Sequence, residues 1–176
     1  MVPFRMFLLA TGTALATGCA TLVGPAPHTV PEGSRLTLEQ PIELPAGRFS
    51  IWIQNSRYDM RSVNEYKPFC ALKGTADAAG SYGPAELRIT QVNYRYDGHT
   101  STPGSWQVAS LTQFNTGDTS ELTMFQTWMQ VSADGPSPIA EVVCSRRDYA
   151  SRGRFVSVED IRRTLAPYFS LELAGE

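Results

Sequence analysis

Most of the chain after residue 35 consists of short runs in which apolar and polar residues alternate, with glycine and proline between the runs. Such alternation places every second side chain on the same face of a β-strand. The clearest run spans residues 48–55, where one face carries Phe49, Ile51 and Ile53. Trp52 points to the opposite face, so we expect it either to be covered by the next segment or to belong to a contact surface. The pattern predicts a mainly β protein.

Similar runs predict strands at 35–39, 42–44, 69–73, 86–97, 106–115, 121–133 and 139–144, and residues 168–173 can return as a last strand. The apolar face of 86–97 changes sides between Ile89 and Val92, which indicates either a β-bulge or a strand shared between two packing surfaces. Segment 121–133 has large apolar side chains on both faces, so we expect it to lie centrally and to be covered on both sides. We expect residues 57–68 to pass over the sheet as a long loop and residues 74–84 to form an exposed connection.

One helix is predicted near the end of the chain. Ser157 and Asp160 form a pattern like a capping box, and Pro167 ends the helix. An apolar stripe, which we expect to plug one end of the β structure, comprises Val158, Ile161 and Leu165. The fold that we expect for residues 35–176 is a single antiparallel β-sandwich or open barrel of about seven or eight strands, with one short C-terminal helix.

Residues 1–18 have the features of a secretory signal peptide. Arg5 supplies a positive charge, residues 6–16 form an apolar run, and Ala16, Thr17 and Gly18 are small residues before a cleavage site. The apolar run is shorter than the roughly 20 residues that a membrane-spanning helix needs. We therefore expect the chain to be exported.

The sequence Ala16-Thr17-Gly18-Cys19 resembles the lipobox of bacterial lipoproteins of the Gram-negative type, although that family usually has leucine where this chain has Ala16. The resemblance implies that the Cys19 thiol is acylated and that Cys19 becomes the first residue after cleavage. Ala20, where aspartate could stand, implies sorting to the outer membrane, with the domain facing the periplasm. The alternative is an ordinary secretory signal with an incidental cysteine.

Once Cys19 is assigned to a lipid, Cys70 and Cys144 remain as a pair. Exported proteins fold where disulfides persist, so we predict a Cys70–Cys144 bond. Neither cysteine has the CxxC spacing of a zinc site, and we expect no metal and no cofactor. Residues 19–34 are rich in proline, which predicts an extended tether between the lipid anchor and the β domain.

The charge of the chain narrows the class of partner. The sequence has 15 Lys and Arg against 17 Asp and Glu, which does not suit nucleic acid because phosphates require a basic surface. The C-terminal quarter is nevertheless locally basic. Its arginines are either solvated or contact an anionic partner such as phospholipid headgroups or cell-wall polymer; they are Arg146, Arg147, Arg152, Arg154, Arg162 and Arg163.

The sequence contains none of the common catalytic motifs. His28 lies in the tether, which leaves His99, in a polar turn, as the candidate base for a hydrolase. Met124 and Met129 are an odd number of residues apart in a predicted strand and so lie on opposite faces, which argues against a shared copper site. We therefore expect that this protein is not an enzyme. Enzyme activity ranks behind the two binding functions described next.

Aromatic residues are the remaining candidates for contact with a ligand or partner. Tyr94, Tyr96 and Trp106 combine apolar area with a polar group, which suits contacts with proteins or glycans; the alternative is partial burial beneath loops. We expect a non-enzymatic interaction or assembly module whose partner is an envelope protein or the cell wall. The alternative is a small-molecule or glycan-binding β domain with a pocket at the mouth of the sandwich or barrel.

Overall fold

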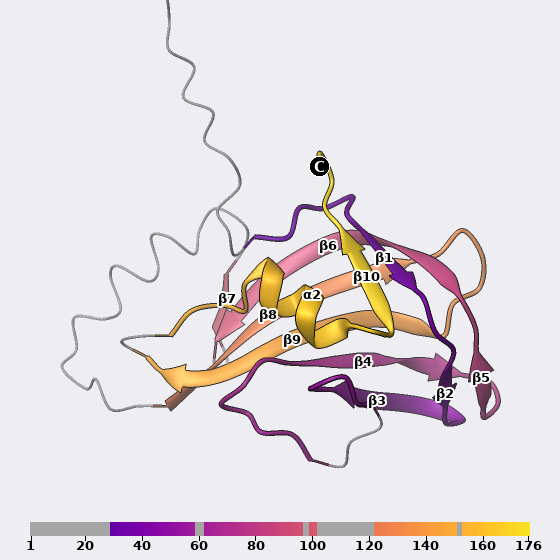
Figure 1. Ribbon diagram of the computed structural model, residues 1–176, viewed down its shortest axis with the longest axis horizontal. Coiled ribbons are helices and arrows are strands. Elements are labelled where there is room, and N and C mark those ends of the chain that lie inside the picture. The colour runs from indigo at the N-terminus through magenta and orange to yellow at the C-terminus, as the bar shows by residue number, and fades with distance from the viewer. Residues whose placement is uncertain (1–28, 59–61, 97–98, 102–121, 151–152) are drawn as a thin grey trace, which may run out of the picture.

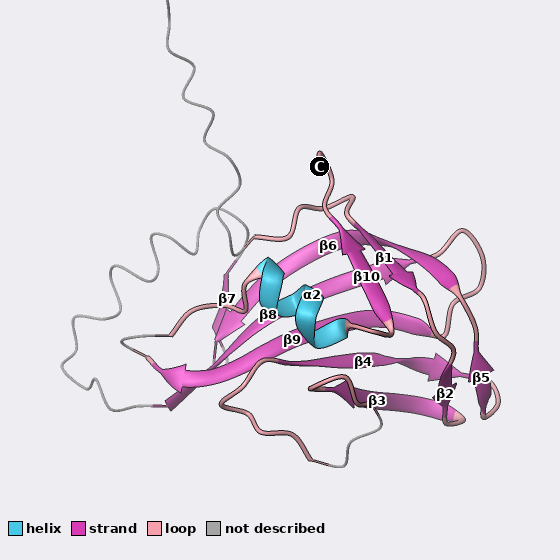
Figure 2. Cartoon of the chain, in the orientation of Figure 1, coloured by secondary structure: helices cyan, strands magenta, loops and turns pink. Residues whose placement is uncertain are grey.

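Antiparallel strands form one large sheet that curls into an open half-barrel (Figures 1 and 2). The structure, a computed structural model, describes residues 29–58, 62–96, 99–101, 122–150 and 153–176. β7 (His99–Ser101) pairs with β6, and β2 (Ile42–Leu44) pairs with β5 (Gly80–Tyr82) in a separate two-stranded sheet. The mainly β fold is thereby confirmed, in its open-barrel form. In spatial order, the main path of the sheet consists of β10 (Phe169–Glu172), β1 (Arg35–Leu38), β6 (Ala85–Tyr96), β8 (Leu122–Ser132), β9 (Ile139–Tyr149), β4 (Phe69–Ala76) and β3 (Gly47–Ile53).

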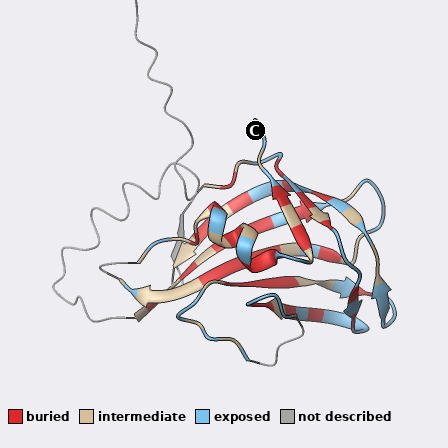
Figure 3. Cartoon of the chain, in the orientation of Figure 1, coloured by how far each residue is buried: buried red, intermediate tan, exposed pale blue. Residues whose placement is uncertain are grey.

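The hydrophobic core fills the concave side of the sheet, between the strands and helix α2 (Val158–Leu165) (Figure 3). The helix packs against β4 and β10 and buries Val158, Ile161 and Leu165. Burying a Val, Leu or Ile side chain fully contributes about 1.5–3 kcal/mol, which exceeds the roughly 1 kcal/mol of a helix cap. The predicted apolar stripe is therefore what holds the helix, which lies over the concave face and not at one end of the sheet as expected.

Helix α2 begins at the predicted cap. The Ser157 hydroxyl oxygen accepts a hydrogen bond from the backbone N–H of Asp160 (3.1 Å), and the hydroxyl donates one to the Asp160 carboxylate (2.9 Å). These bonds satisfy a backbone donor that the first turn of a helix leaves without an intrahelical partner. After the helix, a cis peptide bond between Ala166 and Pro167 leads toward β10.

β10 and β3 are the two edges of the half-barrel, and they do not pair with each other. Tyr58, which follows β3, meets Tyr168, which precedes β10, edge to face with ring centroids 4.9 Å apart. The edge of β10 is also covered, because the Nε atom of Arg162 donates a hydrogen bond to the Leu171 carbonyl (2.9 Å). Side chains thus bridge the opening of the half-barrel without closing it by strand pairing.

A disulfide links two neighbouring strands of the sheet. Cys70 of β4 lies directly opposite Cys144 of β9, with Cα atoms 4.0 Å apart, and both side chains are buried in the core. The predicted Cys70–Cys144 bond is confirmed. It joins residues 74 positions apart in the sequence, so it closes a long loop of the unfolded chain.

Several strand predictions are confirmed and one connection is wrong. β8 is the fourth of the seven strands on the main path, and the register of β6 against β8 shifts between Ile89 and Gln91, at the expected bulge. The exposed connection predicted for 74–84 is wrong, because β4 continues to Ala76 and residues 80–82 form β5. The strand predicted at 106–115 lies outside the described residues.

The β domain begins earlier than the predicted end of the tether. Val30 is 3% exposed and belongs to the core, and its N–H donates a hydrogen bond to the Tyr94 hydroxyl (3.0 Å). Backbone hydrogen bonds also join Gly33 and Ser34 to Ile89. Residues 30–34 therefore pack on the domain, although the prolines of residues 19–34 and the lack of an apolar period there predict a tether.

Candidate interaction surface

The convex face of the sheet, opposite α2, carries a row of side chains outside the core. Trp52 of β3 lies beside Ala71 of β4, Ala71 lies beside Val143 of β9, and Trp128 of β8 ends the row. Strand alternation turns these residues outward, since their neighbours in sequence face the core. Ala71 is 4% exposed and Val143 is 2% exposed, so the middle of the row is covered. Trp52 and Trp128 remain partly exposed at its two ends.

Two cations contact the Trp128 ring. The Lys73 ammonium lies 4.0 Å from the ring centroid, and the Arg95 guanidinium carbon lies 4.1 Å from it. They come from β4 and β6, which lie on opposite sides of β8 in the sheet, and each such contact is worth about 0.5–1 kcal/mol at an exposed site. The indole N–H donates a hydrogen bond to the Gln126 side chain (3.2 Å), which further fixes the ring. We call Trp52, Lys73, Arg95 and Trp128 the convex patch.

In the part of the chain that the structure describes, the cations of the convex patch have no carboxylate partner. None of the ion pairs within the described part of the chain involves Lys73 or Arg95, although Glu141 lies opposite Lys73 in the strand register. The Arg95 Nε atom is also buried without a hydrogen-bond partner among the described residues. A buried donor without a partner costs free energy, which an incoming acceptor can recover. The convex patch therefore combines aromatic surface with positive charge that no carboxylate of the described residues neutralises.

The C-terminal arginines behave differently, because most of them pair with carboxylates of the same chain. This pairing leaves little positive charge for an anionic partner and favours the solvated interpretation. Arg154 is exposed, and Arg152 lies outside the described residues. A side-chain hydrogen bond from Arg162 holds the pKa of the Glu176 carboxyl below its usual range. The ion pairs are Arg146 with Asp148 (3.8 Å), Arg147 with Glu65 (2.9 Å), Arg162 with Glu176, and Arg163 with Glu159 (2.6 Å) and Asp160 (3.2 Å).

A buried glutamine holds the long loop between β3 and β4. The Gln54 side chain is 2% exposed, and its amide nitrogen donates to the backbone carbonyls of Asn64 (2.9 Å), Lys67 (3.3 Å) and Pro68 (3.3 Å). Its side-chain carbonyl accepts a hydrogen bond from the Asn64 N–H (2.9 Å). The loop also reaches the sheet, since the Glu65 carbonyl accepts a hydrogen bond from the Arg147 N–H of β9 (2.6 Å). These bonds agree with the predicted passage of this loop over the sheet.

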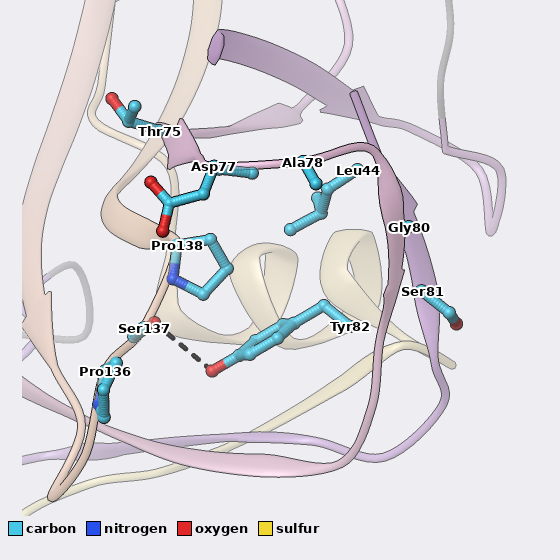
Figure 4. Close-up of a pocket in the computed structure, with 11 residues that line it drawn as sticks. Leu44, Thr75, Asp77, Ala78, Gly80, Ser81, Tyr82, Pro136, Ser137 and Pro138 are labelled. Atoms are coloured by element: carbon cyan, nitrogen blue, oxygen red, sulfur yellow. Dashed lines mark hydrogen bonds between the residues drawn. The ribbon is translucent and has the colours of Figure 1, made fainter. Parts of the chain in front are cut away.

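An open pocket of about 370 Å³ lies between the end of β4, β5 and the loop that joins β8 to β9 (Figure 4). The Tyr82 hydroxyl donates a hydrogen bond to the Ser137 hydroxyl oxygen (3.3 Å), which in turn accepts one from the Ile139 N–H (3.2 Å). The Asp77 carboxylate lies on the opposite side of the pocket from Tyr82, across Pro138 (Figure 4). A second pocket, of about 410 Å³, lies beside α2 and includes Asp160 and Arg163 in its lining. The first pocket offers hydrogen-bonding groups to a small polar ligand.

The three aromatic residues predicted to contact a partner are not brought together by the described structure. Tyr94 is 3% exposed, and its burial in the core raises the pKa of its hydroxyl, so it does not fit a surface contact. Tyr96 is half-buried and its ring stacks near Phe125, with centroids 6.4 Å apart. Neither tyrosine lines the two pockets described above. Trp106 lies outside the described residues.

The other predicted sites are addressed in part. Cys19 lies outside the described residues, and for His99 the structure gives only its place in β7. No group of three or more His, Cys, Asp or Glu side chains that could hold a metal occurs in the described ranges. The helix of the described chain is too short to cross a membrane.

The sequence alone does not show that Lys73, Arg95 and Trp128 belong to one site. The outward position of Trp52 and the placement of Trp128 opposite Met129 were readable from strand alternation. Their convergence was not, because it depends on the order of β4, β9, β8 and β6 in the sheet. A comparison with protein-family models, curated proteins and solved structures finds no match to this chain.

Proposed function

We propose that this chain is a lipid-anchored outer-membrane protein that acts as a non-enzymatic interaction module on the periplasmic side of the envelope. The lipobox-like sequence at Cys19 motivates the anchor, and the Cys70–Cys144 disulfide suits an oxidising compartment. The observation that carries the proposal is the convex patch, which lies outside the core and holds two cations that pair with no carboxylate of the described ranges.

The convex patch suits a partner with an acidic surface. Tryptophan and arginine are enriched among the residues that contribute most to protein–protein affinity. A carboxylate from the partner can pair with Lys73 or Arg95, while an apolar side chain packs on the exposed part of Trp52 or Trp128. The partner that we propose is therefore an envelope protein with an acidic segment, and a cell-wall polymer is the outcome that the experiment must distinguish.

The test compares two single variants, one that removes a charge inside the convex patch and one that removes a charge outside it. R95Q removes a cation that contacts Trp128, whereas R88Q removes an exposed arginine on the same strand that forms no ion pair among the described residues. Full-length proteins are crosslinked in native envelopes, and the adducts are identified by mass spectrometry. A lost contact of about 1 kcal/mol lowers affinity roughly fivefold, so R95Q should lower recovery of a protein adduct by about that factor.

R88Q should recover the adduct as well as the unsubstituted protein does. An equal decrease in adduct recovery for R95Q and R88Q would contradict an interaction through the convex patch. So would the absence of an adduct with the unsubstituted protein. An adduct that contains glycan fragments and no second polypeptide would replace the protein partner with the cell wall.

A second candidate function is binding of a small molecule or glycan, which the pocket beside Tyr82 favours. Y82F removes the hydroxyl that bonds Ser137 in that pocket, whereas Y66F changes a tyrosine that is 60% exposed and does not line it. Calorimetric titration of the full-length protein with a panel of envelope sugars should show saturable binding that Y82F weakens and Y66F does not. Absence of saturable binding, or equal weakening by both variants, would exclude this candidate.

A further inference from the structure

No strand of the described residues pairs with the outer edge of β3, and no side-chain contact like that on β10 covers it there. β3 pairs on one side only, with β4, and its seven residues contain no proline. Gly47, Arg48 and Ser50 are exposed along it. In contrast, β10 has four residues, and Arg162 bonds to one of its carbonyls. An open edge presents backbone N–H and C=O groups with which another strand can pair.

The strand register fixes which backbone groups point outward from β3. Cys70 and Cys144 have Cα atoms 4.0 Å apart, which is the close spacing of a non-hydrogen-bonded antiparallel pair. The backbone groups of Cys70 therefore point away from β9, toward its other partner Ile53 in β3. Since successive residues alternate in direction, Gln54 points outward. The structure agrees, because Gln54 makes both of its backbone hydrogen bonds with Arg57 and not with β4 (3.0 and 3.1 Å).

The same alternation assigns the rest of the strand. Residues 53, 51, 49 and 47 direct their backbone groups to β4, so the backbone N–H and C=O groups of Arg48, Ser50 and Trp52 point outward. No backbone hydrogen bond within the described residues occupies these outward groups. The exposed edge is therefore a row of alternating donors and acceptors.

We propose that β3 pairs antiparallel with β3 of a second copy of this chain, centred on Ser50. In this register Ser50 lies opposite Ser50 of the other copy, and Arg48 lies opposite Trp52 of the other copy. A two-fold interface requires that each residue and its partner exchange roles, and this register meets the requirement. The outward N–H groups of each strand then meet the outward carbonyls of the other.

The side chains favour this register over its neighbours. Arg48 is the one charged residue of β3, and pairing centred on Arg48 would set two arginines opposite each other, which is destabilising. Centring on Ser50 instead sets each Arg48 beside a Trp52 ring, a cation–π pair worth about 0.5–1 kcal/mol. β3 contains no Asp or Glu, so nothing in it favours a partner strand with basic side chains.

The ends of the strand also fit the second copy. The turn at Gln54–Arg57 occupies the outer edge immediately after β3. In the proposed register Ile53 lies opposite Gly47 of the other copy, and Gly47 has a positive φ of 80°, at the point where the chain enters β3 from the preceding turn. The paired region thus ends where the turn begins. Joining the two sheets would place both convex patches on one continuous face, so that a partner with repeated acidic segments could bind both at once.

A proline substitution tests the pairing without breaking the fold. S50P removes an outward N–H and is compatible with an edge strand, because residue 50 donates no hydrogen bond to β4. S50A keeps the N–H and serves as the matched control. Sedimentation of the full-length protein in detergent should give a dimer for the unsubstituted protein and for S50A, and S50P should raise the dissociation constant at least tenfold. Circular dichroism should show native strand content in all three.

A monomeric unsubstituted protein, or a dimer that S50P leaves intact, would overturn the proposal. A second measurement uses cysteine crosslinking in native envelopes. Ser50→Cys places two thiols at the two-fold axis, whereas Ser132→Cys places one at an exposed position of β8, away from the edge. Disulfide-linked dimers should form with S50C and not with S132C. Equal crosslinking of both, or an S50C adduct with a different polypeptide, would contradict pairing between two copies.

Discussion

At the scale of single residues, Gln54 shows a role that alternation along a strand does not predict. Its position beside Trp52 and Ser50 in the sequence suggests an outward polar side chain, but the structure buries it to 2% exposure. The reason is local: the chain reverses at Asn55 and Ser56, which both have positive φ angles, and the returning loop closes over the amide. Only the folded loop supplies the backbone groups that make this burial favourable.

We predict that Gln54→Ala destabilises the domain by about 1–3 kcal/mol, because it leaves backbone groups of the loop without their partners. Hydrogen exchange at Asn64 should become faster, since its N–H bonds to the Gln54 side chain. Gln130→Ala is the control, because Gln130 is exposed on β8. Urea denaturation and amide exchange measure both effects. Equal stability of the two variants would show that water replaces the Gln54 bonds without cost.

The burial of Tyr94 should make the stability of the domain decrease at high pH. Burial raises the pKa of its hydroxyl above the usual value of about 10 for tyrosine, so the folded state retains the proton at a pH where the unfolded state loses it. Stability that Tyr94 contributes is therefore complete below about pH 10 and is lost as the pH rises through the folded-state pKa. Tyr94→Phe should cost about 1 kcal/mol at pH 7, by removing the hydrogen bond from Val30.

The free energy of unfolding of the unsubstituted protein should then fall more steeply above pH 10 than that of Tyr94→Phe. Urea denaturation at a series of pH values measures the two slopes. Parallel slopes for the two proteins would contradict a tyrosine that resists ionisation in the folded state.

At the scale of elements, the sequence predicts those that have their own periodic signal. Alternation identifies β3 and β8, the change of apolar face identifies the bulge in β6, and Ser157 identifies the start of α2. β5 could not be predicted, because its three residues pair with β2, which lies far away in the sequence. The extension of β4 through Gly74 was missed for a similar reason: glycine there indicates a loop until the approach of Pro138 is known.

Gly74 gives a prediction at this scale. A Cβ atom at Gly74 would lie 1.8 Å from the Pro138 carbonyl oxygen, which is rigid backbone and already accepts a hydrogen bond from the Thr75 N–H (2.9 Å). Gly74→Ala must therefore displace β9 from β4, and we expect it to cost about 1–3 kcal/mol or more. Gly80→Ala is the matched control in a strand, since nothing lies within 4 Å of its Cβ position. Thermal denaturation should separate the two variants, and equal melting temperatures would contradict this close approach.

At the scale of the whole molecule, one face of the sheet specifies the fold and the other carries the candidate interaction surface. The concave residues and the apolar stripe of α2 are readable from the sequence, because burial imposes a strict pattern. Only part of the convex patch can be predicted from the sequence. Strand alternation places Trp52 on the face opposite the core. The contact of Lys73 and Arg95 with Trp128 depends on the strand order, in which β4 and β6 flank β8 and β9.

The disulfide stabilises the whole molecule through the unfolded chain. Closing a loop of 74 residues should stabilise the folded state by about 4–5 kcal/mol in the chain-entropy model. We predict that reduction of the native protein lowers the urea midpoint by a corresponding amount. The double variant Cys70→Ala, Cys144→Ala should have a lower urea midpoint than the reduced protein, because the smaller side chains also leave space in the core. A midpoint unchanged by reduction would contradict a stabilising bond.

The proposed lipid anchor acts on the location of the whole molecule and not on its fold. Each buried methylene of an acyl chain contributes about 0.8 kcal/mol, and a single chain holds a protein only marginally, so several chains on Cys19 are expected for stable attachment. Cys19→Ser removes the thiol to which they attach, and it should move the protein from the outer-membrane fraction to the soluble periplasm, with the Cys70–Cys144 bond intact. Mass spectrometry of the N-terminal peptide and of the disulfide peptides checks both statements. A free Cys19 thiol in the unsubstituted protein would remove the anchor from the proposed function, while leaving the disulfide and the pairing of β3 to their own tests.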